Sequence, residues 1–502
     1  MQVEPDFSAF AESYAAGRPQ VVWTRLVADL ETPVSAMLKL ADGRPLSFLF
    51  ESVEGGAVRG RYSFIGLKPD LVWRARGDKA EINRRALTQP DAFEPLAGGA
   101  LQSLRKLIAE CRIEVPAKLP PMAAGLFGYM GYDTVRLMER LPDENPDPIG
   151  IPDAVFLRPT VVAIFDNVED LVTVVTPVWP DKRRSAQQAY EEALNRLAEV
   201  VADLERPLPV KRAAEGEPLA LPDPVSNVTR ERYHEMVERA KEYIRAGDIF
   251  QVVPSQRFHL PFPLPPFALY RALRRLNPSP FLFFLDFGGY ALVGSSPEIL
   301  VRLREGKVTI RPIAGTRRRG KDTEEDKALA ADLLADPKEL AEHLMLLDLG
   351  RNDVGRVAKI GTVKVTEKMV IEYYSHVMHI VSNVEGMIEA KYDAMDALIA
   401  GFPAGTVSGA PKVRAMQIID ELEPERRSFY GGAVGYFAAN GAMDTCIALR
   451  TALVKDGVMY AQAGGGVVAD SQPEAEWQES VNKTKALIRA AEEAVRFGRR
   501  GN

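Results

Sequence analysis

The chain has 502 residues, of which 46% are hydrophobic and 26% are charged, a composition typical of folded globular proteins. Its 63 Lys and Arg residues against 69 Asp and Glu residues give a net charge of −6, which argues against a general attraction to nucleic acid or to anionic membranes. With only two cysteines, no apolar run approaching the roughly 18 residues of a membrane span, and no signal-peptide pattern, we expect a cytoplasmic protein.

The first 205 residues alternate short strand patterns with helical ones. The apolar periodicity predicts helices over residues 7–14, 101–111 and 183–204, and strands over 21–23, 46–52, 122–129, 155–165 and 171–175. Five prolines then fall between residues 206 and 227, where little apolar periodicity remains. We therefore expect an N-terminal domain over 1–205, a connector over 206–227 and a second domain over 228–497.

The second half is predicted to be mostly antiparallel sheet. A helix over 229–247 precedes a single strand over 249–258, and four tight turns then mark hairpins, at Gly288-Gly289, Glu305-Gly306, Asn440-Gly441 and Asp456-Gly457. Helices are predicted between the strands, over 323–335, 337–349, 411–422 and 473–497. Strands in hairpins with inserted helices favour an α+β fold over a repeated βαβ fold.

The helix over 337–349 carries acids beside its apolar side. Asp336 is a candidate N-cap, Glu339 can close a capping box, and Gly350 is a candidate C-terminal end. Glu339 and Glu342 are three residues apart, so their β-carbons lie about 5–6 Å from each other on one face. That face adjoins an apolar stripe formed by Leu340, Leu344 and Leu347.

A helix near the C-terminus repeats this spacing with Glu476 and Glu479, after a candidate capping box of Ser471 and Glu474. Two helices that each present such a pair could supply oxygen ligands for magnesium, which favours carboxylates and retained waters. The competing interpretation is structural, because Glu339 can be a capping residue and Glu479 can pair with Lys483 one turn on.

Other motifs carry polar groups that packing alone does not require. Glu298 follows a strand in GSSPE, His379 lies in a predicted strand, and the run Arg317 to Arg319 is expected to form a solvated turn. Glycine-rich GTVSGAPK precedes a helix, where an exposed helix start suits anions, and AGGGVVADS could let backbone amides approach a ligand. Each motif taken alone also has an ordinary structural explanation.

Eight blocks in order resemble the chorismate-using enzymes, most closely anthranilate synthase component I: SSPE, PIAGT, EHLMLLDLGRND, SGAPK, YGGAVGYF, DTCIALRT, AGGGVVADS and EWQESVNK. The resemblance is dense over residues 228–490 and looser before them. It implies antiparallel sheets packed face to face with helices on the outside. It also implies magnesium-dependent amination of chorismate to anthranilate with loss of pyruvate, the first step of tryptophan biosynthesis.

The resemblance assigns roles to residues that match its motifs. Magnesium would be held by Glu342 and Glu479, with Glu339 and Glu476 in support. Glu298 would be the general acid that helps the ring hydroxyl leave, and His379 would assist the elimination of pyruvate. The substrate would be held by Gly315, Thr316, Tyr430, Arg450, Gly464, Gly465, Gly466 and Lys483, with Thr316 also counted among the catalytic residues.

Two positions separate the subfamilies that the chain resembles. Relatives that add water carry a lysine base where Gln251 stands, and aminodeoxychorismate synthase component I carries a lysine nucleophile where Ala314 stands. Neither residue of this chain can do that chemistry, which favours anthranilate as the product. The alternatives are aminodeoxychorismate synthase component I and, from another class, a non-catalytic tryptophan-binding regulator.

Ammonia is expected from a separate subunit. Cys111 falls in a predicted helix and Cys446 in a predicted strand, so neither lies in the elbow of a glutaminase nucleophile. The resemblance implies a glutamine amidotransferase partner, anthranilate synthase component II, in a heterotetramer with two copies of each component. It also implies inhibition by tryptophan bound near an ES and an NPSP element, with candidate contacts Ser52, Pro280, Phe281 and Leu282.

Overall fold

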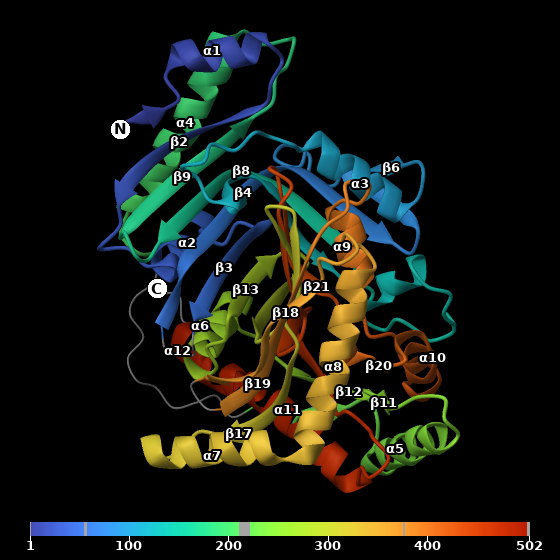
Figure 1. The fold of residues 1–502 in the computed structure, drawn as a ribbon. Coiled ribbons are helices and arrows are strands. Elements are labelled where there is room, and N and C mark those ends of the chain that lie inside the picture. Colours follow the sequence, from blue (N-terminus) through green and yellow to red (C-terminus); the bar gives the residue numbers. More distant parts are fainter. Residues whose placement is uncertain (1, 55–57, 210–220, 375–376, 499–502) are drawn as a thin grey trace.

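The computed structural model describes residues 2–54, 58–209, 221–374 and 377–498 (Figure 1). The helices in this part of the chain are α1 Phe7–Ala15, α2 Pro33–Ala41, α3 Ala100–Glu110, α4 Ala186–Glu205, α5 Arg230–Arg245, α6 Pro266–Leu276, α7 Thr323–Ala335, α8 Pro337–Gly355, α9 Ala394–Gly401, α10 Lys412–Leu422, α11 Pro473–Glu493 and α12 Val495–Gly498. Short 3₁₀ turns are η1 Pro121–Ala123, η2 Tyr132–Leu137 and η3 Gly405–Val407.

The strands before the predicted connector are β1 Val3–Glu4, β2 Gln20–Val27, β3 Ser47–Glu54, β4 Val58–Arg76, β5 Lys79–Asn83, β6 Glu94–Leu96, β7 Gly125–Met130, β8 Ala154–Asp166 and β9 Leu171–Val178. The later strands are β10 Val225–Ser226, β11 Gln251–Val252, β12 Ser255–Pro261, β13 Phe281–Asp286, β14 Tyr290–Ser296, β15 Ile299–Arg304, β16 Lys307–Ile310, β17 Ile313–Arg318, β18 Lys364–Tyr373, β19 Val377–Met387, β20 Gly409–Ala410, β21 Ala433–Ala438, β22 Met443–Ile447, β23 Thr451–Lys455 and β24 Val458–Gly464.

The two halves of the chain share one antiparallel sheet. Strand β3 pairs with β13, and β7 pairs with β21, so strands from before the connector lie between strands from after it. The end of the predicted connector also joins the sheet, because β10 pairs with β12, while residues 210–220 lie outside the described residues. All four predicted hairpins are confirmed by the pairs β13–β14, β15–β16, β21–β22 and β23–β24.

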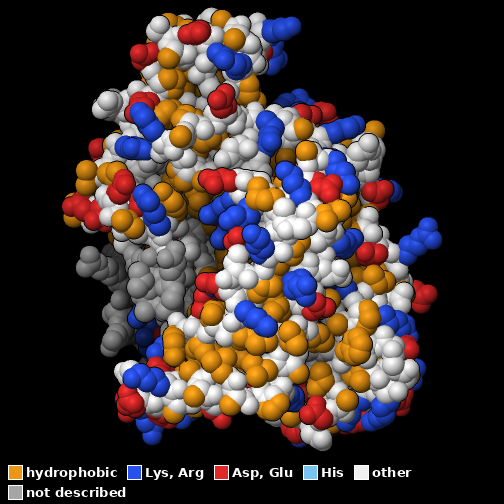
Figure 2. Space-filling model, in the orientation of Figure 1, with side chains coloured by type: hydrophobic (Ala, Val, Ile, Leu, Met, Phe, Trp, Pro, Cys, Tyr) orange, Lys and Arg blue, Asp and Glu red, His pale blue; other side chains and the backbone are white. Residues whose placement is uncertain are grey.

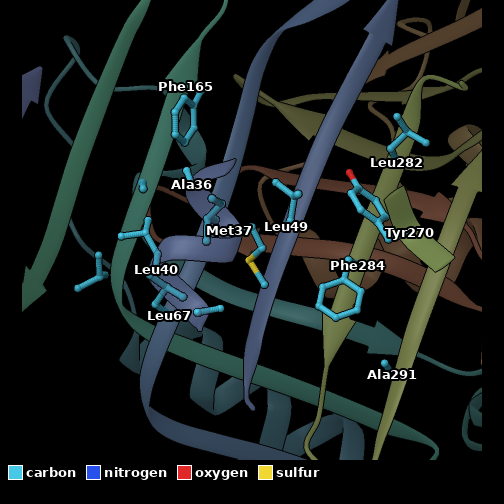
Figure 3. Close-up of a cluster of buried hydrophobic side chains, with 14 of the residues drawn as sticks. Ala36, Met37, Leu40, Leu49, Leu67, Phe165, Tyr270, Leu282, Phe284 and Ala291 are labelled. Atoms are coloured by element: carbon cyan, nitrogen blue, oxygen red, sulfur yellow. The ribbon is translucent and has the colours of Figure 1, made fainter. Parts of the chain in front are cut away.

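The sheet folds back on itself, and aromatic side chains fill the space between its two arms. Phe48 stacks on Phe127 with ring centroids 4.7 Å apart, and Tyr436 meets Phe64 edge-on at 5.7 Å. A second cluster lies between one arm and the helices α1, α2, α4, α6 and α11 (Figure 3), and a third packs α3, α8 and α9 on the other arm. The predicted α+β fold with face-to-face antiparallel sheets and outer helices is confirmed.

Three local predictions differ from the structure. The strand predicted over 249–258 is broken at Val253 and Pro254, because β11 pairs with β20 whereas β12 pairs with β24. Helix α8 does not end at Gly350 but continues to Gly355, and Gly350 is buried in its interior, where a β-carbon would be in ordinary contact with Ile310 and Val384. Leu344 of the predicted apolar stripe is 52% exposed.

Figure 2 shows one face of the molecule, with acidic and basic side chains intermixed and hydrophobic ones gathered across its lower part, where β19 and α8 lie in Figure 1. In the part of the chain that the structure describes, every helix is too short or too polar to cross a bilayer.

Candidate functional site

A cavity of about 1290 Å³ opens between α8, α11 and the ends of several strands. It collects residues that are up to 239 positions apart, counted from Ile244 to Lys483. The predicted site residues that line it are Gln251, Glu298, Gly315, Thr316, Glu339, Glu342, His379, Tyr430, Arg450, Gly464, Gly466, Glu476, Glu479 and Lys483. The structure therefore brings the predicted catalytic, metal and substrate residues into one place.

Helices α8 and α11 supply the acidic side chains. Asp336 caps α8 as predicted, accepting hydrogen bonds from the backbone N–H groups of Lys338 and Glu339. Burial, followed by the neighbouring charges of Glu339 and Glu479, raises the pKa of Glu342 above its usual range. These carboxylates are thus close enough to repel one another, and a cation among them would relieve that repulsion.

Glu476 has one carboxylate oxygen satisfied and one free within the described structure. The Ser471 hydroxyl donates to Oε1 at 2.7 Å, whereas Oε2 is buried without a hydrogen-bond partner. Ser471 therefore does not close the predicted capping box, and Gln472 is the N-cap of α11, without a side-chain cap. Burial raises the pKa of Glu476. Its second oxygen lacks a hydrogen-bond partner, and a bound cation would satisfy it.

The other two acids contact cations of the protein. Arg317 donates to Glu339 at 3.1 Å and also to Asp332 and Asp336, so it is an ion-pair hub and not the predicted solvated turn. Glu479 pairs with Lys483 at 2.7 Å, as the structural alternative predicted. Among the described residues, no three His, Cys, Asp or Glu side chains converge closely enough to hold a metal ion. The donor chemistry of the four glutamates nevertheless suits magnesium.

Glu298 also lines the cavity and is only 4% exposed. Burial raises the pKa of this carboxyl group to about 8. The Thr406 hydroxyl has the opposite effect on the pKa, because it donates a hydrogen bond to Oε1 at 2.8 Å. Glu298 is therefore protonated at neutral pH and can give a proton to a leaving group.

His379 is placed to act as a base. Its Nδ1 lies 3.2 Å from the carbonyl oxygen of Gly315, which can only accept, so Nδ1 carries the proton in this contact and Nε2 keeps its lone pair. The Thr316 hydroxyl lies 3.0 Å from the same nitrogen. Burial in the cavity wall lowers the pKa of His379 to about 4, so the imidazole is neutral at physiological pH.

Fixed positive charge faces the same space. Arg450 has a φ of 48°, a left-handed conformation that is unusual for a residue with a side chain, and no carboxylate among the described residues lies within ion-pair distance of it. Lys483 donates to the carbonyl of Gly464 at 2.9 Å besides pairing with Glu479. Burial raises the pKa of Tyr430 to about 12, which keeps its hydroxyl neutral.

The glycine run after β24 has a steric reason. A β-carbon at Gly465 would lie 2.7 Å from Oε2 of Glu476, and one at Gly466 would lie 2.3 Å from the amide nitrogen of Gln251. A β-carbon at Gly464 would meet the carbonyl of Pro254 at 2.4 Å. Glycine is therefore needed here because side chains of the site and a backbone carbonyl occupy the space that a β-carbon would take. The approach of backbone amides to a ligand stays a prediction.

Comparison with known proteins agrees with this geometry. A family model described as chorismate binding enzyme matches residues 59–489. Anthranilate synthase component 1 of Cereibacter sphaeroides is 63% identical over 494 residues, which are 98% of this chain and 99% of that protein. The protein of the same name from Pseudomonas putida is 51% identical over 470 residues, covering 92% and 93%.

The chain belongs to the anthranilate synthase component 1 family of chorismate binding enzymes. The crystal structure of anthranilate synthase component I from Streptococcus pneumoniae TIGR4 matches with a TM-score of 0.75 and 37% identity, covering 92% of this chain and 99% of that one. The menaquinone-specific isochorismate synthase of Escherichia coli shares the fold, with a TM-score of 0.69, 20% identity, and coverage of 96% and 99%.

Within this family of chorismate binding enzymes, the two positions expected to separate subfamilies face or adjoin the cavity. The Gln251 amide nitrogen lies 3.4 Å from Oε1 of Glu342, and the amide oxygen is buried without a partner among the described residues. Ala314 is a buried residue of β17 that also lines the cavity. Gln251 cannot act as the lysine base expected in relatives that add water, and Ala314 cannot act as the lysine nucleophile expected in aminodeoxychorismate synthase component I.

Three of the four predicted inhibitor contacts, Ser52, Phe281 and Leu282, lie on the paired strands β3 and β13 outside the cavity. In the β3–β13 pair Ser52 lies opposite Phe281, and Glu51 lies opposite Leu282. Side chains alternate along a strand, so Leu282 points away from Phe281 into the core cluster, where it lies near Tyr270 (Figure 3). The ES and NPSP elements are therefore adjacent, and tryptophan binding there stays a prediction.

Three residues at the site were not identified from the sequence. Thr406 bonds to Glu298, Ser471 bonds to Glu476, and Arg317 neutralises Glu339. Thr406 belongs to GTVSGAPK, the glycine-rich segment predicted to precede a helix, in which Gly409 and Ala410 are buried and form β20 against β11. The glycine-rich loop therefore contributes Thr406 to the cavity wall, and anion binding at the start of α10 stays a prediction.

Proposed function

We propose that this chain is the aminase component of an anthranilate synthase, which converts chorismate and ammonia into anthranilate and pyruvate. The observation that carries the proposal is the pair of proton-transfer groups on one cavity, a buried carboxyl group with a pKa of about 8 at Glu298 and a neutral imidazole with an available Nε2 at His379. Amination needs an acid for the departing hydroxyl, and elimination needs a base for a ring proton.

The residues suggest an order of events. Chorismate is a dianion, so Arg450 and Lys483 would attract its carboxylates into the cavity. As ammonia adds to the ring and the double bonds shift, Glu298 gives its proton to the departing hydroxyl, which leaves as water. The added nitrogen gives up its extra proton. His379 then takes the ring proton as the bond between the ring and the enolpyruvyl oxygen breaks, the ring becomes aromatic, and the departing enolate takes up a proton from the imidazolium or from water to become pyruvate.

Magnesium is part of the proposal. Glu342 and Glu479, supported by Glu339 and Glu476, would hold the ion between α8 and α11, and the uncompensated oxygen of Glu476 and the raised pKa of Glu342 support this choice. When bound, the ion would supply a positive charge for a substrate carboxylate.

We also propose the setting in which the chain works. Ammonia would come from a glutamine amidotransferase subunit, anthranilate synthase component II, in a heterotetramer with two copies of each component. Both thiols, Cys111 and Cys446, are buried and burial raises their pKa, so neither is a suitable glutaminase nucleophile. Free buried thiols suit the reducing cytoplasm, and tryptophan would inhibit the enzyme.

The proposal is tested with the purified chain, chorismate and magnesium, supplied with either ammonium or glutamine. We expect anthranilate fluorescence with ammonium and none with glutamine, because the nucleophile for glutamine is on the partner. No turnover with ammonium, together with retained tryptophan binding, would replace the proposed enzyme by a non-catalytic regulator.

The pH dependence follows from Glu298. Because its protonated form is the active one, kcat/KM is expected to stay high below pH 8 and to fall tenfold per unit above it, with the midpoint near the pKa of about 8. The measurement is anthranilate formation from pH 6 to 10 at a constant concentration of free ammonia, since ammonium itself titrates. A rate that keeps rising through this limb would contradict the assignment of Glu298 as the acid.

Ser52→Phe is expected to relieve inhibition by tryptophan. Ser52 packs so closely on Gly60 of β4 that a β-carbon at Gly60 would lie 2.5 Å from the Ser52 Oγ, so a phenyl ring at position 52 must displace its neighbours, and Phe281 lies opposite it on β13. We expect at least a tenfold rise in the half-inhibitory tryptophan concentration and uninhibited turnover within about twofold of the unmodified chain, since a single packing change outside the cavity leaves its chemistry intact. Ser52→Ala, which adds no bulk, is the matched control; unchanged inhibition in the phenylalanine variant would exclude this site.

A further inference from the structure

A buried ion pair beyond the cavity wall is not used by the chemistry above. Arg427 is 1% exposed and Glu423, which follows α10, is 4% exposed. The guanidinium group donates from Nε to Glu423 at 3.0 Å and from Nη2 at 2.6 Å, the two-pronged geometry that only arginine can give to a carboxylate. Burying both charges is costly, and replacing such a pair by apolar side chains is often neutral for stability. Stability alone therefore does not explain it.

The remaining donors of Arg427 reach two backbone segments of the cavity wall. Nη1 donates to the carbonyl of Val407 at 2.5 Å, and Nη2 donates to the carbonyl of Val253 at 2.7 Å. Val407 directly follows Thr406, whose hydroxyl bonds to Glu298, and Val253 lies two residues after Gln251. One rigid, planar group thus fixes the segments that carry both side chains.

Glu423 extends the same network toward the cavity. Its Oε1 accepts hydrogen bonds from the backbone N–H and the hydroxyl of Ser255, each at 2.8 Å, and that hydroxyl accepts from Gln462, which lines the cavity. The guanidinium carbon of Arg427 lies over the ring of Tyr132 at 4.7 Å and 5.5 Å from the ring centre of Tyr430. Packing on both rings leaves the group little freedom to move.

We infer that the Glu423–Arg427 pair is a positioning element for the general acid, acting through the Val407 carbonyl and the Thr406 hydroxyl on Glu298. This inference rests on the proposed role of Glu298. The pair does not touch the cavity chemistry directly. Its effect is to hold Thr406 where the hydroxyl can donate to the Glu298 carboxylate, which sets how readily that group releases its proton.

The substitution that tests this is Arg427→Lys. Lysine keeps the charge but is a point donor, so it cannot hold Glu423, Val407 and Val253 together. The matched control is Arg158→Lys, the same substitution outside the cavity. Arg158 is a partly buried arginine that forms a bidentate ion pair with Asp70 and stacks on Trp179. Both variants are assayed with chorismate, magnesium and saturating ammonia, and their unfolding temperatures and chorismate affinities are measured alongside.

Arg427→Lys is expected to lower kcat by about tenfold or more, to leave chorismate affinity within about threefold, and to move the basic limb of the pH profile up by about half a unit. The shift is upward because loss of the Thr406 hydrogen bond removes a stabilisation of the Glu298 carboxylate. The titratable neighbour of Glu298 is Tyr374, whose pKa is raised by burial and by nearby carboxylates including Glu298, so it stays neutral over this range. Arg158→Lys is expected to keep the limb where it is.

A double-mutant cycle with Thr406→Val decides whether the effect passes through Thr406. If it does, adding Thr406→Val to Arg427→Lys lowers kcat by less than about twofold further. Additive losses, or a lower unfolding temperature with an unmoved pH limb, would overturn the inference while the unmodified chain still makes anthranilate. If the lysine variant does not fold, Glu423→Gln takes its place, and an unmoved limb there overturns the inference as well. Failure of the unmodified chain to make anthranilate would refute the proposed function instead.

Discussion

Glu298→Gln is expected to lower kcat with ammonia by about 10²–10⁴-fold, the range that a positioned proton donor contributes. Glutamine has the shape of the protonated acid and can still accept the Thr406 hydrogen bond of 2.8 Å, but it has no acidic proton for the departing hydroxyl. Because the residue is buried and uncharged at neutral pH, the substitution introduces no new charge. Chorismate affinity should therefore change by less than about threefold.

The control for Glu298→Gln is Asp444→Asn, which makes the same type of change at a buried carboxylate away from the cavity. Asp444 pairs with Arg302 at 3.0 Å and with Arg304 at 2.6 Å, so its replacement is expected to lower the unfolding temperature but to keep turnover within about twofold. Turnover of Glu298→Gln near that of the unmodified chain would remove Glu298 from the mechanism.

Glu479→Gln is expected to abolish nearly all magnesium-dependent turnover. The carboxylate lies on α11, faces the cavity together with Glu342 and Glu476, and pairs with Lys483 at 2.7 Å. Its loss removes a proposed ligand and leaves Lys483 without its partner. We expect magnesium affinity to fall by at least about 100-fold, more than is typical for loss of an outer-shell contact, with turnover falling correspondingly at fixed magnesium.

Glu474→Gln is the matched control for Glu479→Gln, because Glu474 lies on the same helix but pairs with Arg230 at the surface. Magnesium affinity is measured by calorimetry and turnover by anthranilate fluorescence over a range of magnesium concentrations. Equal magnesium affinity in the two variants would contradict the assignment of Glu479 as a ligand, and retained tryptophan binding with no turnover in the unmodified chain would favour the regulator.

Local sequence patterns predicted most of the elements. The helix over 323–335 begins and ends as predicted, and the four hairpins follow from turns whose residues favour positive φ, such as Gly306 and Gly457. The break between β11 and β12 could not be predicted in this way. It results from two pairing partners, β20 and β24, that lie more than 150 residues further along the chain.

The catalytic, metal and substrate residues were identified through family motifs, and the structure places all of them except Gly465 on the cavity lining. The contacts made by Thr406 and Arg427 were not identifiable from the sequence, because each joins segments far apart in the chain. Thr406 is 108 residues from Glu298, and the Arg427 contact to Val253 spans 174 residues. Periodicity reports only neighbours along one element, so contacts of this kind require the fold.

The most direct test of the central claim is the identity of the product that the chain alone makes from chorismate, magnesium and isotope-labelled ammonium. We expect labelled anthranilate and one equivalent of pyruvate by mass spectrometry, which requires both the Glu298 and the His379 steps. An unlabelled isochorismate product, or labelled aminodeoxychorismate, would contradict the central claim and would assign the cavity to a different reaction of chorismate.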